Sequence, residues 1–348
     1  MAAEQLAPFE LPIPPHFAPS MVGQVWRVPY QTHAEAARQW AQQHDIAPAN
    51  QDRQKICLLI IDAQNTFCIP EFELFVGGRS GTGAVDDNRR LCEFIYRNLP
   101  RLTAIIPTLD THQAMQIFHP VFWCDGAGNH PPAMTMITLD DVQQGRWQVN
   151  LAVADALGMS AAALTAYALH YVQSLSQEDK YPLTIWPYHS MLGGIGHSLV
   201  SAIEEATFFH GMARQTQPQL ALKGNHPLTE NYSVLRPEVM RTSDGEVIAH
   251  KNMALIQKLL IFDAVLIAGQ AQSHCVAWTI DDLLTEIQGI DPTLAQKVYL
   301  LEDCTSPVVV PGVVDFTPQA TASFARFAAA GMHIVHSTTP MVNWLRIS

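Results

Sequence analysis

Residues 265–279 read VLIAGQAQSHCVAWT, an apolar run followed by a glycine, a cysteine and the start of a helical pattern. The apolar run suits a buried strand of a parallel sheet. Gly269 permits a sharp turn, and from about Ser273 the apolar spacing becomes helical. Cys275 is therefore predicted to lie at a strand-to-helix turn, near a helix N-terminus. Free amide N–H groups and the helix dipole at such a turn favour a thiolate and can bind an oxyanion.

The same alternation of strands and helices continues from residue 55 to the end of the chain. Predicted strands cover residues 55–61, 103–109, 183–186, 219–222, 264–268, 297–301 and 333–336, and predicted helices cover residues 85–99, 161–174, 196–215, 252–260 and 319–329. This pattern predicts an α/β fold with a mostly parallel sheet that is covered by helices on both faces. In such sheets the ligand lies beyond the carboxyl ends of the strands.

Two segments interrupt the alternation. Residues 1–54 are rich in proline but also contain Leu, Phe, Ile and Trp, so we expect an N-terminal arm that packs on the main domain of residues 55–348. Within the arm, Thr32 with a glutamate three residues later is typical of a capping box that opens a short helix. Residues 113–182, in which Pro, Gly and Trp are frequent, are predicted to form an insertion that covers the site or makes a subunit interface.

Composition narrows the class of protein. The net charge of −12 argues against nucleic acid and anionic membranes as partners. Apolar runs are short and the first residues lack a basic and an apolar region, so no transmembrane helix or secretory signal is expected. The six cysteines are scattered without disulfide-like spacing, which indicates a reducing compartment. We therefore expect a cytoplasmic protein. We also expect it to assemble as a homo-oligomer.

Three candidate catalytic residues follow predicted strands: Asp62, Lys223 and Cys275. A thiol needs a base to become a good nucleophile, and a nearby cation stabilises the thiolate. Each residue alone has an ordinary explanation. Asp62 could be a turn cap, Lys223 a solvated side chain and Cys275 a buried packing residue. At one sheet edge, however, a carboxylate and an ammonium would supply both needs of the cysteine.

Four sequence motifs occur here in the order found in a known enzyme family. They are DAQNTF at residues 62–67, Gly77-Gly78, Lys223-Gly224 and GQAQSHCV at residues 269–276. These segments resemble the Asp-x-Gln-x-x-Phe motif, the glycine loop, the Lys-Gly segment and the nucleophile turn of the nicotinamidase and isochorismatase-like cysteine hydrolases. The resemblance covers roughly residues 55–340 without the insertion. It implies a three-layer sandwich with a six-stranded parallel sheet.

The same resemblance implies roles for individual residues. The catalytic triad would be Asp62, Lys223 and Cys275. The backbone N–H groups of Ala271 and Cys275 would form an oxyanion hole. The family also has a cis peptide bond at this turn, which would fall between Gln270 and Ala271.

A second pair of motifs distinguishes the branches of this family. The segments DTH (residues 110–112) and WPYH (residues 186–189) each follow a predicted strand. Two imidazoles and one carboxylate are suitable ligands for a divalent metal ion. By resemblance to the nicotinamidase branch, the implied ligands are Asp110, His112 and His189, with Zn favoured and Mn or Fe possible. The isochorismatase branch lacks this metal. His119 falls later than the next histidine of the family motif, so it is not in the implied set.

These motifs predict a cysteine-dependent amidohydrolase that cleaves a small carboxamide, with nicotinamide as the leading substrate. The resemblance implies that Phe67 and Trp186 flank an aromatic ring in the substrate pocket. His274 lies beside Cys275, but neighbouring helical residues point about 100° apart, so we do not expect them to form a catalytic pair. The alternatives are a metal-free isochorismatase-type hydrolase, another amide or carbamoyl hydrolase of the same fold, and a non-enzymatic binding protein.

Overall fold

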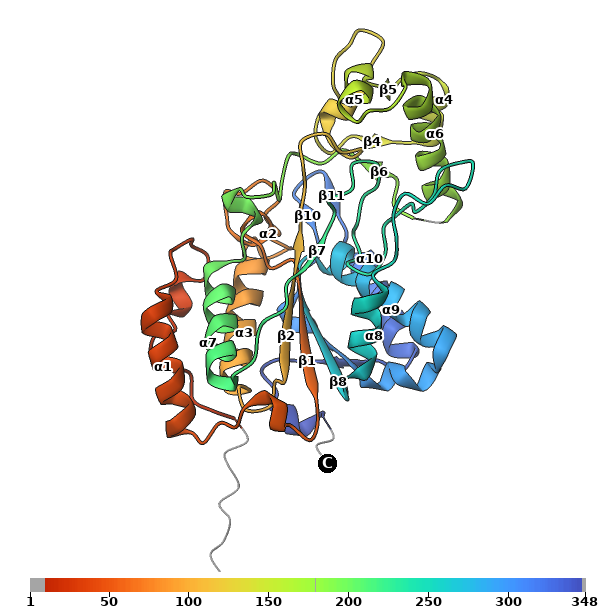
Figure 1. Cartoon of the computed structure of the whole chain (residues 1–348). Helices are drawn as coiled ribbons and strands as arrows, with labels where there is room; N and C mark the ends of the chain where they lie inside the picture. The colour runs from red at the N-terminus through yellow and green to blue at the C-terminus, as the bar shows by residue number, and fades with distance from the viewer. Residues whose placement is uncertain (1–9, 179, 346–348) are drawn as a thin grey trace, which may run out of the picture.

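The computed structural model describes residues 10–178 and 180–345, and a single parallel sheet lies at its centre (Figure 1). The strands lie in the order β12, β9, β8, β1, β2, β7, and every neighbouring pair is parallel. Their bounds are β1 (Ile56–Ile61), β2 (Ala104–Asp110), β7 (Ala221–Lys223), β8 (Ala264–Gly269), β9 (Val298–Leu301) and β12 (His333–Val335). The predicted α/β fold with a parallel six-stranded sheet is thus confirmed.

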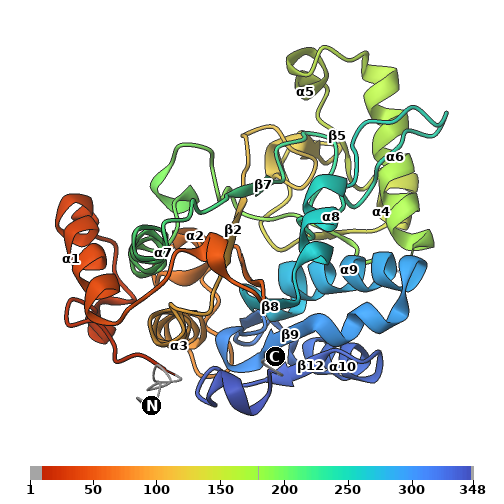
Figure 2. The ribbon, with the colours of Figure 1, turned by 60° about the horizontal axis from the view of Figure 1, so that its bottom comes forward.

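The central strand β1 explains how the two faces of the sheet are covered. All of its residues are buried, which accounts for the unbroken apolar run ICLLII. Cys57, Leu59 and Ile61 pack into one core, whereas Leu58 and Ile60 pack into the other, because alternate side chains of a strand point to opposite faces. One face carries α8 (Met253–Ile261), α9 (Ala277–Ile290) and α10 (Thr317–Ala329), and the other carries α3 (Gly83–Arg97) and α7 (Ser201–Arg214) (Figures 1 and 2).

The N-terminal arm adds an outer layer to the second face. Its helix α1 (Tyr30–Gln43) lies against α7 on the side away from the sheet (Figures 1 and 2). The capping box predicted at Thr32 is wrong. The helix begins at Tyr30, directly after Pro29, and Thr32 lies inside its first turn. A proline favours the start of a helix because its φ is already set, and Glu35 instead forms an ion pair with Arg38 one turn later.

The insertion between β2 and β7 forms a lobe beyond the carboxyl ends of the strands (Figure 1). It contains two antiparallel ladders, which pair β3 (Trp123–Cys124) with β5 (Gln148–Val149) and β4 (Met136–Ile137) with β6 (Leu183–Thr184). Its helices are α4 (Leu139–Gln143), α5 (Leu151–Ala156) and α6 (Ala161–Gln177). The strand predicted at residues 183–186 is therefore shorter than expected and does not join the main sheet, because its hydrogen-bonding partner is β4.

Two further segments lie at the same edge of the sheet. The short helix α2 (Asn65–Cys68) follows β1, and a hairpin of β10 (Val309–Val310) and β11 (Val314–Asp315) follows β9. None of the helices in the described part of the chain combines the length and the apolar character needed to cross a membrane. All six cysteines are free thiols.

Candidate active site

Four polar side chains meet where the central strands end. Asp62 follows β1, Asp110 is the last residue of β2, and Lys223 is the last residue of β7. Cys275 enters from the turn that follows β8, and β8 is the other neighbour of β1. All four residues are buried. Parallel pairing thus gathers two carboxylates, one ammonium and one thiol at a single place, as expected for strand ends at one edge of a sheet.

Lys223 lies at the centre of this group. Its Nζ is 3.0 Å from Asp62 Oδ2 and 2.9 Å from Asp110 Oδ1. The same Nζ donates a hydrogen bond to the backbone carbonyl of Asn231 at 2.8 Å and lies 3.6 Å from Cys275 Sγ. The structure therefore brings together the three residues predicted as a triad, and it adds Asp110 as a second partner of the lysine.

The burial of these groups sets their ionisation. Burial alone would lower the pKa of Lys223, but the carboxylates of Asp110 and Asp62 outweigh it and hold this pKa well above its usual range. Burial raises the pKa of Asp62 and raises the pKa of Cys275 well above its usual range, although Lys223 opposes both shifts. The resting site therefore contains an ammonium beside a protonated thiol. A carboxylate with a raised pKa is also a stronger base than an exposed aspartate.

Two polar residues, Thr108 on β2 and Gln64 just after β1, hold the carboxylates in place. The Thr108 hydroxyl donates to Asp62 Oδ1 at 2.5 Å, and it accepts a hydrogen bond from the Asp62 N–H at 3.0 Å. Gln64 accepts a hydrogen bond from the Asp110 N–H at 2.7 Å and donates its amide to the Asp110 carbonyl at 2.8 Å. These bonds fix the two aspartates relative to one another, and they give the Gln of the DAQ segment a structural role.

The turn after β8 has the backbone that the sequence predicts. Gly269 has φ +113°, and a Cβ atom at this position would lie only 2.0 Å from the carbonyl oxygen of Ile61, so no other residue fits. The peptide bond between Gln270 and Ala271 is cis, as the resemblance implied. A π-helical turn (Gln272–Val276) then carries the cysteine into α9.

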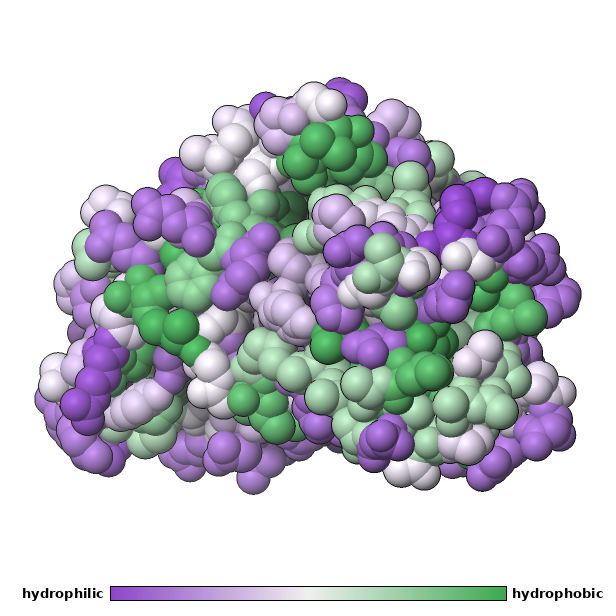
Figure 3. Space-filling model, turned by 90° about the horizontal axis from the view of Figure 1, so that it is seen from above, coloured by the Kyte–Doolittle hydropathy of each residue, from purple (hydrophilic) through white to green (hydrophobic). Residues whose placement is uncertain are grey.

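A cavity of about 520 Å³ opens onto the thiol. Ala271 and Cys275, whose N–H groups were predicted to bind an oxyanion, both line it, as do the predicted pocket residues Phe67 and Trp186. Met134 of the insertion and the β10–β11 hairpin complete its walls. Figure 3 views this edge of the molecule from outside and shows apolar side chains gathered between polar ones. The cavity therefore suits an uncharged, partly apolar ligand.

The polar groups on the cavity wall are held by the protein itself. Trp186 Nε1 donates to Glu230 Oε1 at 2.8 Å and lies 3.2 Å from the Tyr232 hydroxyl. Burial raises the pKa of Glu230 well above its usual range, which favours the neutral form of this carboxyl. His274 Nδ1 bonds to the Ser273 hydroxyl at 2.8 Å, and burial lowers the pKa of His274 to about 3. His274 thus lines the cavity as a neutral imidazole.

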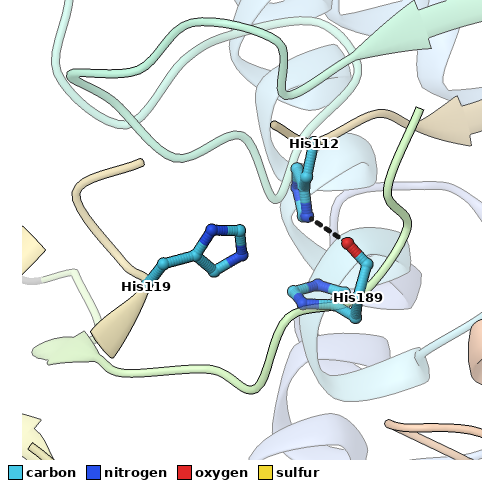
Figure 4. Close-up of side chains that lie close together, drawn as sticks. All are labelled: His112, His119 and His189. Carbon is cyan, nitrogen blue, oxygen red and sulfur yellow. Dashed lines mark hydrogen bonds between the residues drawn. The ribbon is translucent and has the colours of Figure 1, made fainter. Parts of the chain in front are cut away.

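Three histidines converge in the structure (Figure 4), and two of them lie beside Asp110. Each uses Nδ1 to donate to a backbone carbonyl: His112 to His189 at 3.1 Å, His119 to Ala114 at 3.1 Å and His189 to Pro187 at 2.8 Å. A carbonyl can only accept, so each Nε2 is left with a free lone pair in the neutral ring. The ligand atoms of the three rings lie within 4.8 Å of one another. Ring orientation by outer hydrogen bonds is typical of metal-binding histidines.

Several observations show that this cluster fits a divalent metal ion. His119 Nε2 is buried and has no hydrogen-bond partner among the described residues. Asp110 Oδ1 lies 3.0 Å from His112 Nε2, and Asp110 Oδ2 lies 3.7 Å from His189 Nε2. A Cβ atom on Gly224 would come within 2.6 Å of Asp110 Oδ1, so the glycine after the lysine keeps this space open. Three imidazoles and a carboxylate form a ligand set suited to Zn, Fe or Mn.

His119 is the ligand candidate that the sequence interpretation left out. The predicted set of Asp110, His112 and His189 comes together, but His119 joins it from the beginning of the insertion. The feature of the sequence that could have indicated this ligand is its position shortly after the DTH segment, between Phe118 and a proline. Thr108 was also missed, because a single threonine in an apolar strand gives no indication of its partner.

We expect His119→Ala to weaken metal binding at this cluster by more than about 100-fold, since an outer-shell change alone typically costs 10–100-fold. Equilibrium dialysis against zinc, followed by metal analysis, should show one ion fewer per chain than the wild type. His250→Ala removes an exposed histidine outside the cluster and should leave the metal content unchanged. An unaltered zinc content in His119→Ala would remove this residue from the ligand set.

Comparison with known proteins gives matches at the level of structure alone. No family model and no curated protein sequence matches the chain. A nicotinamidase/pyrazinamidase from Acinetobacter baumanii is 18% identical, with a TM-score of 0.49, over 83% of this chain and 99% of that chain. The yeast nicotinamidase Pnc1p bound to the inhibitor nicotinaldehyde is 16% identical, with a TM-score of 0.49, over 81% of this chain and 99% of that chain.

A zinc complex of the pyrazinamidase from Pyrococcus horikoshii is 16% identical, with a TM-score of 0.42, over 81% of this chain and 99% of that chain. Each of these three neighbours is named a nicotinamidase or a pyrazinamidase. An isochorismatase-like hydrolase from Alkaliphilus metalliredigens is also similar, at 12% identity. At these identities, the geometry and chemistry of the site itself carry the functional inference.

Proposed function

We propose that this protein is a cysteine-dependent hydrolase of a small carboxamide. The observation that carries the proposal is the position of Lys223 Nζ, 3.0 Å from Asp62 Oδ2 and 3.6 Å from Cys275 Sγ, at a cavity that the cysteine lines. A base, a cation and a thiol in contact are the parts needed to activate a sulfur nucleophile. The cavity supplies room for the amide.

In the first half of the reaction, Cys275 loses its proton to Asp62 and its sulfur attacks the carboxamide carbon. Lys223 balances the negative charge as it moves from the carboxylate to the sulfur. The backbone N–H groups of Ala271 and Cys275 donate to the oxygen of the tetrahedral intermediate. The carbon–nitrogen bond then breaks, and Asp62 returns the proton to the departing ammonia. The product at this stage is a thioester on Cys275.

In the second half, Asp62 takes a proton from a water molecule, and the resulting oxygen nucleophile attacks the thioester carbon. The carbon–sulfur bond breaks, and the sulfur of Cys275 recovers the proton from Asp62. The net reaction consumes one water and yields one carboxylic acid and one ammonia. Asp62 acts as base in each half, which requires the fixed position that Thr108 gives it.

The histidine cluster serves binding rather than acyl transfer. A divalent metal bound by Asp110, His112, His119 and His189 would supply a Lewis-acid position that holds a ring nitrogen or a water molecule of the substrate complex. The residues themselves orient one another through the bonds to Asp110 and the backbone. A metal-free isochorismatase-type hydrolase would leave the unpaired Nε2 of His119 without a purpose.

Nicotinamide, converted to nicotinate and ammonia, is the leading substrate. The aromatic side chains of Phe67 and Trp186 on the cavity wall favour a planar ring, and the metal cluster favours a ring nitrogen. A second candidate is a larger aromatic amide or carbamoyl compound. It is favoured by the cavity volume of about 520 Å³, which lies in the range that accepts drug-sized ligands.

The test follows ammonia release from nicotinamide and from a set of larger aromatic amides, with zinc added. We expect release from at least one of them, and mass spectrometry of a quenched reaction should find the acyl group on Cys275. A Cys124→Ala variant, which removes a partly exposed thiol that does not line the cavity, should behave as the wild type. No release from any member of the set would count against amide hydrolysis.

A further inference from the structure

We propose that a second divalent metal ion binds between the N-terminal arm and the catalytic domain, at His16, His33 and Glu205. His16 lies in the proline-rich part of the arm, His33 lies on α1, and Glu205 lies on α7. One ligand atom from each of the three lies within 4.8 Å of the others. The site belongs to the outer helical layer, whereas the histidines beside Asp110 lie at the carboxyl edge of the sheet. It therefore does not depend on the function proposed above.

The distances in this cluster suit shared coordination better than hydrogen bonding. His16 Nε2 is 3.5 Å from Glu205 Oε1, and His33 Nε2 is 3.4 Å from Glu205 Oε2. Good N–H···O hydrogen bonds are shorter, at about 2.7–3.2 Å. Ligands that surround zinc tetrahedrally at about 2.0–2.1 Å are separated from one another by roughly 3.3–3.4 Å. Each nitrogen–oxygen distance is thus close to one edge of such a tetrahedron, with the two imidazoles facing different oxygens of the same carboxylate.

The surroundings prepare these groups as ligands. His33 and Glu205 are 5% and 6% exposed, so water competes weakly for them. Trp26 Nε1 donates to Glu205 Oε2 at 3.3 Å, as an outer-shell partner of a ligating carboxylate does. The Tyr96 hydroxyl forms a hydrogen bond with His16 Nε2 at 3.1 Å, which orients this imidazole.

The ligand types indicate which metal binds and what it does. Two imidazoles and one carboxylate suit Zn²⁺ rather than Mg²⁺ or Ca²⁺, which prefer oxygen ligands. The ion would join the arm and α1 to α7, and through Tyr96 it would also approach α3. Metal binding of this kind contributes to folding, because the unfolded chain holds no preformed site. The site therefore fastens a proline-rich segment that forms few regular contacts of its own.

The experiment counts zinc ions per chain after chelator treatment and dialysis against Zn²⁺. The wild type should bind two ions, and His33→Ala and Glu205→Gln should each bind one. Glu205→Gln keeps the shape of the side chain and an oxygen that accepts from Trp26. A loss of zinc in this variant is therefore not explained by misfolding. His44→Ala removes a histidine just beyond the end of α1 that lies outside the cluster, and it should still bind two. Circular dichroism confirms that each variant is folded.

A second measurement isolates the proposed ion. In a His119→Ala background the cluster beside Asp110 is weakened, so zinc should still raise the melting temperature through the arm site. Adding Glu205→Gln to this background should abolish the rise. The proposal is overturned if His33→Ala and Glu205→Gln bind as much zinc as the wild type. It is equally overturned if zinc does not raise the melting temperature of the His119→Ala protein, which would leave a simple His33–Glu205 contact.

Discussion

Cys275→Ala is expected to lower kcat/KM for amide hydrolysis by on the order of 10⁴-fold or more, which leaves only the contribution of binding and of the oxyanion N–H groups. The reason is that no other thiol lines the cavity: Cys68, Cys124 and the remaining cysteines lie outside it among the described residues. The measurement is ammonia release with the best amide found in the substrate set, together with the loss of the acyl-enzyme signal.

The same variant should still bind substrate. Removing one sulfur atom leaves Phe67 and Trp186 in place, so the dissociation constant of the amide should change by less than about tenfold, within the effect of one modest contact. Tryptophan fluorescence reports this binding, since Trp186 lines the cavity. A Cys275→Ala enzyme with wild-type turnover would show that the reaction uses another nucleophile.

Lys223→Met should destabilise the protein as well as inactivate it. Methionine is close to lysine in length but carries no charge, so Asp62 and Asp110 would be left buried without their cation. Loss of one partner of a buried ion pair typically costs about 3–5 kcal/mol in the free energy of unfolding. Urea unfolding measures this loss, and kcat/KM should fall in parallel because the thiolate is no longer stabilised.

The loss of unfolding free energy caused by Lys223→Met should depend on pH. In the wild type His112 and the Lys223 ammonium together hold the pKa of Asp110 well below its usual range, against the effect of burial, so this stabilisation is present at neutral pH and is lost as the pH falls through that pKa. Without the lysine, the carboxylates take up protons at higher pH and cease to repel one another. The difference in unfolding free energy should therefore narrow toward pH 4.

Lys55→Met provides the matched control for this prediction. Lys55 is exposed at the opposite end of β1, so its replacement should change the unfolding free energy by no more than about 0.5 kcal/mol. Equal urea midpoints for Lys223→Met and the wild type would mean that the buried carboxylates do not need this ammonium. Their protonation at neutral pH would then be the simplest explanation.

The main sheet could be predicted from the sequence because its strands are short apolar runs that stop at polar residues. The strand predicted at residues 55–61 is Ile56–Ile61, and the one predicted at residues 264–268 is Ala264–Gly269. Helix α7 was predicted to begin at residue 196 but begins at Ser201. The intervening residues form a separate 3-10 turn at Ile195–His197 and then an extended segment, where Leu199 pairs with Gln64.

The candidate site was predictable only where it follows from strand ends. Asp62, Lys223 and Cys275 come together because parallel strands end at one edge, which is a rule of topology. The position of His119 depends instead on how the insertion folds back toward the strand ends. No local sequence pattern predicts this position. The far wall of the cavity, formed by Met134 and the β10–β11 hairpin, depends on the same kind of long-range packing.

This division of the cavity has a consequence for redesign. The reacting groups lie at the carboxyl ends of the sheet strands, whereas Ala133 and Met134 reach the cavity from the insertion and Val308–Val310 reach it from the start of the hairpin. The substrate preference of the protein can therefore be exchanged by grafting these two loops, while the order and spacing of the reactive side chains stay untouched. Natural variation in such loops would let one ancestral catalyst diversify into a series of enzymes that share a reaction but differ in the molecule they accept.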